Sequence, residues 1–180
     1  MNKYVLDANV FIEAKNNHYG MDFCPAFWDW LLAAHKSGLV CSIEAVSDEL
    51  KQQPDDDEDD EDELSKWTKG AGSCLFLPHD EQMVKQFPAV AAWANGQKYT
   101  LDAVSTFLGS ADMFLVAFGL AHKSIVVTHE RASDSVKKLK VPDACRGLGV
   151  TCVRPYDMLR AEGAKFYIQP GADAINAIRH

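Results

Sequence analysis

Short hydrophobic runs recur along the chain, and helical patterns separate them. Five runs have the length and apolar character of buried strands: 2–6, 39–43, 73–77, 125–128 and 149–153. Helices are predicted to begin at or near five residues: Pro25, Ser47, Asp80, Ser110 and Pro155. Strands that alternate with helices predict right-handed crossovers and a mostly parallel sheet of four to five strands, covered on both faces. The sequence therefore predicts an α/β fold.

The length and composition fit one domain. With 180 residues and 47% hydrophobic residues, the chain can bury a sizeable core. We expect a single domain at 1–163, with a surface insert at 55–63 and a C-terminal tail at 164–180. No apolar run approaches the roughly 20 residues that cross a bilayer, so no membrane contact is expected. The five scattered cysteines form no CxxC pair, which is typical of small buried residues in a reduced, cytoplasmic protein.

The net charge of −8 is concentrated in one segment. Nine consecutive acidic residues occupy 55–63, so that 17 of the 26 acidic residues remain elsewhere against 18 basic ones. The rest of the chain is therefore almost neutral, and its overall acidity does not exclude a nucleic-acid substrate, which needs only a local basic approach. The acidic block itself is typical of a solvated insert, with contact to a basic partner as the alternative.

Four acidic residues are predicted to lie at the carboxyl edge of the sheet. Asp7 and Glu130 follow the first and fourth hydrophobic runs, and Glu49 and Asp112 are placed in the first turns of helices. Clustered carboxylates repel one another, and a hard divalent cation such as Mg²⁺ or Mn²⁺ relieves that repulsion. Such an ion can activate water for phosphodiester hydrolysis. The alternative for Glu49 and Asp112 is the general preference for acids in the first turn of a helix.

Four segments resemble the motifs of the PIN-domain nucleases. Val-Leu-Asp-Ala-Asn-Val at 5–10 is similar to their opening strand, and Asp-Glu-Leu at 48–50 to their second acidic motif. Ser-Ala-Asp at 110–112 is similar to their third motif. Val-Thr-His-Glu at 127–130 resembles their Thr-x-Asp signature, with Glu in place of Asp. The resemblance covers about residues 1 to 160 and looks closest to a bacterial subgroup often encoded beside an antitoxin.

This resemblance implies a three-layer α/β/α sandwich and a metal-dependent endoribonuclease, the toxin of a type II toxin–antitoxin pair. The residues it implies as ligands of Mg²⁺ or Mn²⁺ are Asp7, Glu49, Asp112 and Glu130, the last directly or through water. Asn9 would orient Asp7, and Thr128 would hydrogen-bond a carboxylate or a phosphate. The implied partners are RNA and a cognate antitoxin, and a second copy of the chain is a further candidate.

Several alternatives stay open at this point. Glu44 and Asp48 compete with Glu49 for the second acidic position. The basic candidates for substrate phosphates are Arg131, Lys137 and Lys138. His129 could assist a proton transfer, but in a strand it should point away from its neighbour Glu130, which favours a structural role.

Two other functions compete with the nuclease. A haloacid-dehalogenase-type phosphatase would use Asp7 as its nucleophile, but Asn9 cannot donate the proton that its general acid supplies. A non-catalytic binding module would keep the fold, leave the metal site idle and use the acidic block for a partner.

Overall fold

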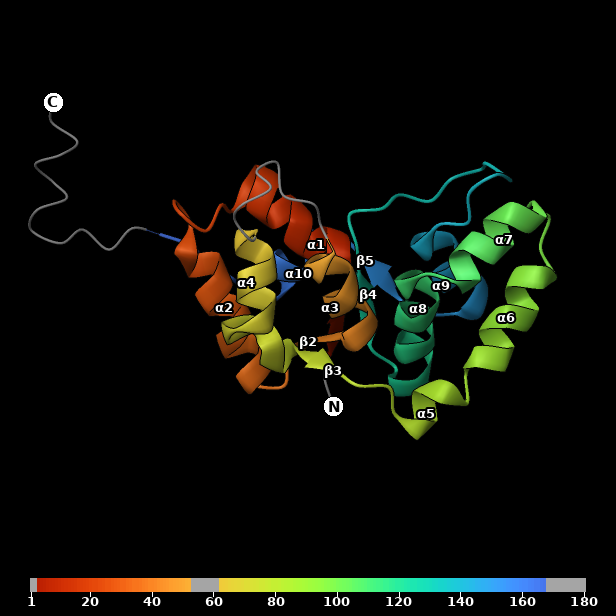
Figure 1. Ribbon diagram of the computed structural model, residues 1–180, viewed down its shortest axis with the longest axis horizontal. Helices are drawn as coiled ribbons and strands as arrows, with labels where there is room; N and C mark the ends of the chain where they lie inside the picture. The colour runs from red at the N-terminus through yellow and green to blue at the C-terminus, as the bar shows by residue number, and fades with distance from the viewer. Residues whose placement is uncertain (1–2, 53–61, 168–180) are drawn as a thin grey trace, which may run out of the picture.

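A parallel sheet forms the centre of the computed structural model, which describes residues 3–52 and 62–167 (Figure 1). The strand order is β3-β2-β1-β4-β5. The strands are β1 (Tyr4–Leu6), β2 (Val40–Ile43), β3 (Phe76–Leu77), β4 (Ile125–Val127) and β5 (Cys152–Val153). All four neighbouring pairs are parallel, and Tyr4 lies opposite both Val40 and Ile125. The residue that follows β1 therefore lies in the middle of the carboxyl edge.

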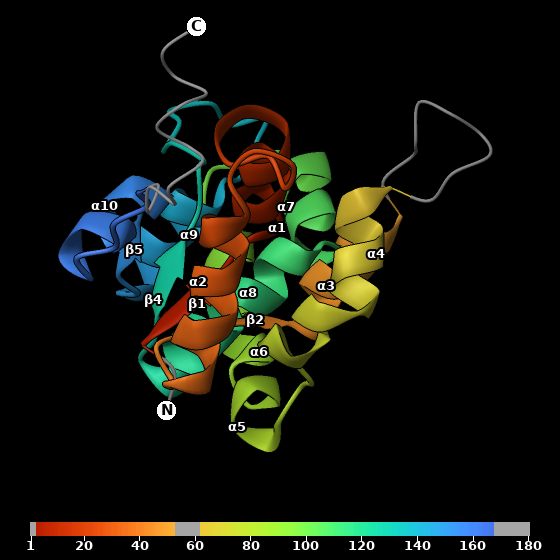
Figure 2. The same ribbon diagram turned by 90° about the vertical axis from the view of Figure 1, so that its left-hand side faces the viewer.

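Helices cover both faces of the sheet, which confirms the predicted three-layer α/β/α sandwich. Figure 1 shows three helices on one side of the sheet: α2 (Pro25–Lys36), α4 (Glu63–Lys69) and α10 (Pro155–Ala161). The other side carries α8 (Ala111–His122), surrounded by α5 (Glu81–Val84), α6 (Phe87–Asn95), α7 (Leu101–Leu108) and α9 (Val141–Leu148). Figure 2 shows α2 in front of β1 and β2, and α3 (Glu44–Lys51) beside α4.

The central helix α8 packs unusually close to the sheet because Gly119 has no side chain. A Cβ atom at this position would lie 2.9 Å from both Val126 Cγ2 and Val150 Cγ1. The helix is buried on most sides, as its apolar sequence predicts. Since α8 runs from the carboxyl edge toward the opposite end, its first turn and Asp112 are fixed at that edge.

Two strands are followed at once by helices. The helix α1 (Ala8–Glu13) begins directly after Asp7 and continues into η1 (Ala14–His18), and α3 begins directly after β2. The prediction that a helix begins near Ser47 was therefore wrong, since Ser47 lies inside α3 and is buried. Glu49 accordingly lies in the second turn of α3, and Glu44 occupies the first.

Other elements differ from the sequence prediction. The helix expected from Asp80 to about residue 94 is divided into α5 and α6, because Pro88 begins a new helix and cannot continue the preceding one. The run at 73–77 is mostly the 3₁₀ helix η2 (Ala71–Leu75), and only its last two residues form β3. The helices α1, α4, α7 and α9 were not predicted.

The boundaries of the acidic insert and of the C-terminal tail differ from those that the sequence predicts. Residues 55–61 of the acidic block lie outside the described residues, but Asp62 is the N-cap of α4 and Glu63 is its first residue. Asp62 is buried, accepts hydrogen bonds from the backbone N–H groups of Leu64 (3.0 Å) and Ser65 (3.1 Å), and pairs with Lys15. Asp62 therefore caps α4 as part of the folded body and is not a solvated residue.

The C-terminal segment continues to pack beyond residue 163. The Phe166 ring lies 5.6 Å from the ring of Tyr19 and 5.9 Å from that of Phe27, measured between centroids. The packed body therefore includes Phe166, three residues beyond the predicted boundary, while residues 168–180 of the tail lie outside the described part of the chain.

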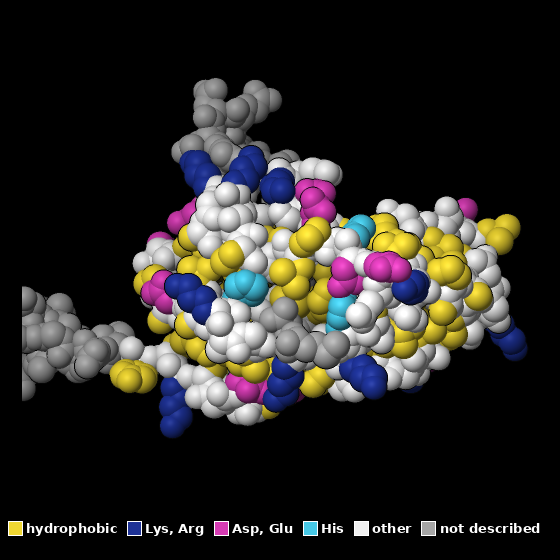
Figure 3. All heavy atoms as spheres, turned by 90° about the horizontal axis from the view of Figure 1, so that it is seen from below, with side chains coloured by type: hydrophobic (Ala, Val, Ile, Leu, Met, Phe, Trp, Pro, Cys, Tyr) yellow, Lys and Arg dark blue, Asp and Glu magenta, His cyan; other side chains and the backbone are white. Residues whose placement is uncertain are grey.

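The end of the molecule opposite the carboxyl edge has a mixed surface. Hydrophobic, acidic, basic and histidine side chains are interspersed there (Figure 3). Cys41 and Cys145 are buried as expected, whereas Cys74 is exposed. Among the described residues, no single helix is long and apolar enough to span a membrane, although α7 and α8, bent by 67°, meet that test as a pair.

Candidate active site

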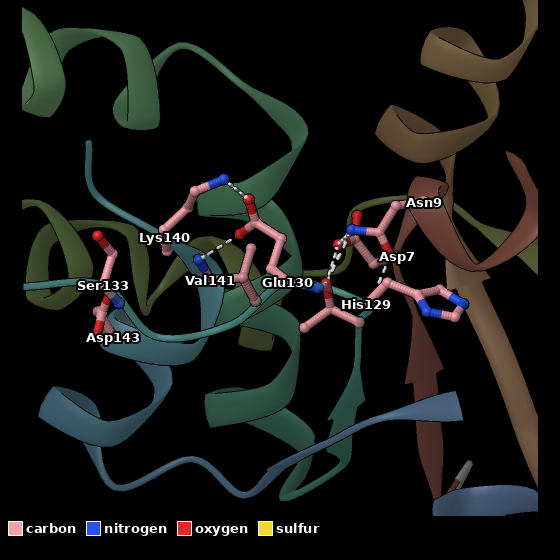
Figure 4. A network of polar contacts seen from close by, with 9 residues as sticks. Asp7, Asn9, His129, Glu130, Ser133, Lys140, Val141 and Asp143 are labelled. Atoms are coloured by element: carbon pink, nitrogen blue, oxygen red, sulfur yellow. Dashed lines mark hydrogen bonds and ion pairs between the residues drawn. The ribbon is translucent and has the colours of Figure 1, made fainter. Parts of the chain in front are cut away.

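Asp7 lies at the centre of the carboxyl edge and is held by two side chains. It is only 4% exposed. Its Oδ2 accepts hydrogen bonds from Asn9 Nδ2 (2.6 Å) and from the Thr128 hydroxyl (2.6 Å), as shown in Figure 4. Both contacts predicted for Asn9 and Thr128 are thus present. They fix the orientation of the carboxylate through one of its two oxygens.

The same two residues join the turn after β1 to the turn after β4. Asn9 Nδ2 also donates to Thr128 Oγ1 (2.9 Å), and the backbone N–H of His129 donates to Asn9 Oδ1 (2.8 Å). The N–H of Glu130 donates to Thr128 Oγ1 (3.0 Å). Because hydrogen bonds link the two turns at several points, Asp7 and the residues that follow β4 are held in a fixed relation.

The charges of Glu49 and Glu130 act on both Asp7 and Asp112. Burial raises the pKa of Asp7 to about 6; the Thr128 hydrogen bond opposes this, and the charges of Glu130 and Glu49 add to it. Burial, followed by the charges of Asp7, Glu130 and Glu49, raises the pKa of Asp112 to about 7. Partial loss of solvation also raises the pKa of Glu49, although much of this residue is exposed. The four predicted acids therefore form one electrostatic group.

The two rival acids of α3 lie elsewhere. Glu44 lines a separate groove with Ser47 and Thr68, and Asp48 pairs with Lys51 at 3.3 Å. Of the three acids on this helix, Glu49 is the one whose charge acts on Asp7 and Asp112.

Glu130 points away from Asp7 and toward the start of α9 (Figure 4). Its Oε1 pairs with Lys140, and its Oε2 accepts a hydrogen bond from the backbone N–H of Val141 (2.9 Å). This carboxylate therefore satisfies an N–H group in the first turn of a helix and holds a lysine beside the site. Sequence reasoning did not give Glu130 this role, because the start of α9 was not predicted.

A groove of about 330 Å³ opens beside Asp112 and Glu130. One wall is formed by α7, including Asp102, Thr106 and Phe107, and the other by residues 137–140. Lys137 and Lys138, two of the predicted phosphate-binding residues, line this second wall, as does Lys140. Arg131, the third, is exposed and lies outside the lining.

The loop between β4 and α9, which carries Lys137 and Lys138, is anchored at two points. The backbone N–H of Ser133 donates to the buried carboxylate of Asp143 (3.1 Å), and the N–H of Thr100 donates to the Val136 carbonyl (2.9 Å). Arg146 pairs with the same Asp143 at 2.8 Å. These contacts hold Lys137 and Lys138 against the first turn of α7, so the groove has a defined basic wall.

Comparison with known families adds one finding. The chain matches the family described as Domain of unknown function (DUF4411) over residues 4–166. It belongs to this family. No curated protein and no solved structure is significantly similar to the chain.

The DUF4411 match includes every residue of the site. It begins in β1, before Asp7, and ends at Phe166, the last residue of the packed aromatic contacts described above. The family description names no activity.

The acidic residues of this DUF4411 chain are of the type that binds a divalent cation. Asp7, Glu49 and Asp112 offer hard carboxylate oxygens, and burial, with neighbouring carboxylates adding to it for the two aspartates, raises their pKa values. Within the described residues, however, no three side chains of His, Cys, Asp or Glu converge closely enough to hold one ion. The residue types fit Mg²⁺ or Mn²⁺, provided that the side chains rotate toward one another when the ion binds.

Proposed function

We propose that this chain is a metal-dependent endoribonuclease of the PIN type. One observation carries the proposal: at the carboxyl edge of a parallel sheet, beyond the larger effect of burial, the charge of Glu49 raises the pKa of Asp7, and the charges of Asp7 and Glu49 raise the pKa of Asp112. In open α/β sheets this edge is where ligands bind. A lysine-lined groove beside the acids supports a polyanionic substrate.

Asp7, Glu49 and Asp112 are the residues that would hold the ion. A bound Mg²⁺ or Mn²⁺ would supply an activated water and stabilise the charge that develops on the phosphodiester. Asn9 and Thr128 orient Asp7 through Oδ2. Because Glu130 is engaged by Lys140 and Val141, we assign it a place at the edge of the site, where it can act through water.

The substrate would enter from the groove. Lys137 and Lys138 on its wall would contact backbone phosphates, which carry most of the affinity of such complexes but no sequence information. Asp102 lies on the opposite wall, where its carboxylate would repel the substrate phosphates. The strand would therefore follow the lysine wall toward Asp112.

The cellular role that we propose rests on the resemblance. We infer that the chain acts in the cytoplasm as the toxin of a type II pair and that a cognate antitoxin is its partner. Induced expression should then arrest growth, and Asp7→Asn should relieve the arrest. Arrest that persists unchanged in Asp7→Asn would count against a toxic nuclease.

Cleavage of RNA by the purified protein tests the proposal directly. We expect cutting with Mg²⁺ or Mn²⁺, none with EDTA, and a loss of at least about 100-fold in Asp7→Asn and Asp112→Asn, a size typical of a lost electrostatic contact at the reaction centre. Glu44→Gln is the matched control, since it removes a charge from the same helix as Glu49 but lines another groove. Cleavage retained in both aspartate variants would overturn the site, and inactivity with several structured RNAs would favour the non-catalytic binding module.

A further inference from the structure

Three aromatic side chains cluster beside Asn9, away from the lysine groove. His18 comes from η1, His129 follows β4, and Tyr156 lies in α10. The two imidazole rings are stacked with their centroids 5.5 Å apart. Tyr156 meets both of them edge to face, at 5.4 Å from His18 and 5.6 Å from His129.

The cluster is fixed to the acidic centre through one residue. The His129 backbone N–H donates to Asn9 Oδ1, and Asn9 Nδ2 donates to Asp7 Oδ2. Figure 4 shows the His129 ring directed away from Glu130 and past Asn9. The aromatic cluster and the lysine wall therefore lie on different sides of Asp7, as expected for a site that holds a nucleotide on each side of one phosphate.

The rings are not closed off inside the core. The side chain of His18 is 33% exposed, and His129 and Tyr156 are each half-buried. Rings that served only to fill the core would be covered, as Phe11 and Phe27 are. The three rings here come from separate segments and together present an aromatic surface that solvent reaches.

The charges around the cluster do not favour a phosphate. Glu13 Oε2 lies 4.0 Å from His18 Nε2, and Arg154 Nε lies 3.5 Å from Asp157 Oδ2. Arg160 also pairs with Asp157, at 3.6 Å, so two carboxylates and two guanidinium groups balance, whereas the groove wall on the other side carries lysines. A flat, uncharged ligand fits this surface better than an anion does.

We propose that His18, His129 and Tyr156 form a stacking site for one nucleobase of single-stranded RNA, next to the phosphate that an ion held by Asp7 would contact. The proposal deepens the nuclease function and rests on it. Aromatic rings that stack on bases tolerate any base, because each base presents a π face. The site would therefore position the strand without selecting its sequence.

Binding of single-stranded RNA in EDTA tests this stacking site without cleavage. The probe is a short oligonucleotide, compared with the same oligonucleotide carrying one abasic position, and the protein carries Asp112→Asn so that no cutting occurs. We expect His18→Ala and Tyr156→Ala each to weaken binding of the intact strand about 5- to 100-fold, the range of one base–aromatic stack. His18→Phe and Tyr156→Phe keep the rings and should bind within a few-fold of the parent.

The abasic strand separates stacking from other effects. When the abasic position is the one whose base would stack, the parent protein should bind the abasic strand as weakly as the alanine variants bind the intact strand. The alanine variants should bind the abasic strand no more weakly than they bind the intact one. His79→Ala is the matched control, because this exposed histidine also stacks on a ring, Phe114 at 4.8 Å, but precedes α5.

The outcomes distinguish this inference from the nuclease proposal. Equal losses for intact strands and for strands with an abasic residue at any position would overturn the stacking site, as would an absence of RNA binding by the parent. Base-dependent binding without metal-dependent cleavage in the unmutated protein would instead support the stacking site and count against the nuclease.

Discussion

At the scale of single residues, Asp7 is a position where burial and charge oppose each other. Its carboxylate is almost inaccessible to water, and the two side chains that bond to it, Asn9 and Thr128, are neutral. Burying an ionised carboxylate without a cationic partner costs free energy of folding. Such an arrangement is tolerated where a bound ion later supplies the missing positive charge.

The first prediction follows from the direction of these pKa shifts. The folded-state pKa values of Asp7 (about 6) and Asp112 (about 7) both exceed the ordinary value of 3.8. The folded state therefore binds protons more tightly, so these groups reduce stability progressively as pH rises from about 4 to about 7. In EDTA, we expect these groups to lower the free energy of unfolding by about 1–3 kcal/mol between pH 5 and pH 8.

Urea unfolding of three proteins at both pH values checks this. Asp7→Asn should raise stability at pH 8 and flatten the pH dependence, because it removes one charge from the group. Glu44→Gln, outside the group, should keep the slope of the parent. If the free energy of unfolding changes equally between the two pH values in the parent and in Asp7→Asn, the buried carboxylate does not cause the pH dependence.

At the scale of elements, the sequence pattern predicted the sheet better than the short helices. Its hydrophobic runs place all five strands, and the apolar length of α8 marks it as the buried helix. In contrast, α1 has six residues and begins without a break after Asp7, so no turn signal separates it from β1. Helix periodicity needs more residues than that to be recognised.

The candidate site could be predicted only in part, for the same reason. The positions of Asp7 and Asp112 follow from the carboxyl ends of strands and from a long helix. The pairing of Glu130 with Lys140, ten residues further along the chain, depends on where α9 begins. The aromatic cluster joins three segments that are distant in sequence, so no local pattern could reveal it.

Lys140 precedes α9 and provides the second prediction. It lowers the pKa of Asp112 and pairs with Glu130. Lys140→Met should make the acidic group more negative and leave Glu130 without its cation. We therefore expect Mn²⁺ to bind several-fold more tightly and RNA more weakly, because charge near a site acts with opposite sign on a cation and a polyanion.

Titration calorimetry with Mn²⁺ and RNA binding in EDTA measure the two effects separately. Lys123→Met is the control, since Lys123 is an exposed residue at the far end of α8. Weaker Mn²⁺ binding in Lys140→Met would indicate that the lysine supports the metal site by positioning Glu130, contrary to the expectation.

The third prediction concerns the contact between α8 and the sheet. Gly119→Ala would place a methyl group 2.9 Å from two branched valine side chains, Val126 and Val150. Such overpacking in a core costs about 1–3 kcal/mol. Gly109→Ala is the control, because its Cβ would meet two backbone carbonyl oxygens, those of Ser105 at 3.3 Å and Thr106 at 3.8 Å, and no side chain within 4 Å. Thermal unfolding should show a clear loss for the first variant and little change for the second.

At the scale of the whole molecule, charge is distributed unevenly. The carboxyl edge collects the acids of the site and the lysines of the groove, while the opposite end has interspersed charges (Figure 3). The acidic run at 55–63 carries nine negative charges, one more than the net charge of −8. A cation that binds this chain therefore has two candidate locations, the buried acidic group and the acidic run, and the two can be told apart by their effect on stability.

The last prediction uses that difference. An ion that binds only the folded state stabilises it by about 2.7 kcal/mol at 100 times its dissociation constant, which for a chain of this size raises Tm by roughly 5–10 °C. Ions that bind the acidic run equally well in folded and unfolded chains stabilise little. Thermal unfolding in increasing Mn²⁺ should therefore show a large rise in Tm for the parent. Asp7→Asn keeps the whole acidic run, so any rise that remains in this variant measures the contribution of the run. An equal rise in both proteins would place the bound ions outside the carboxyl edge and remove the main support for a metal-dependent enzyme.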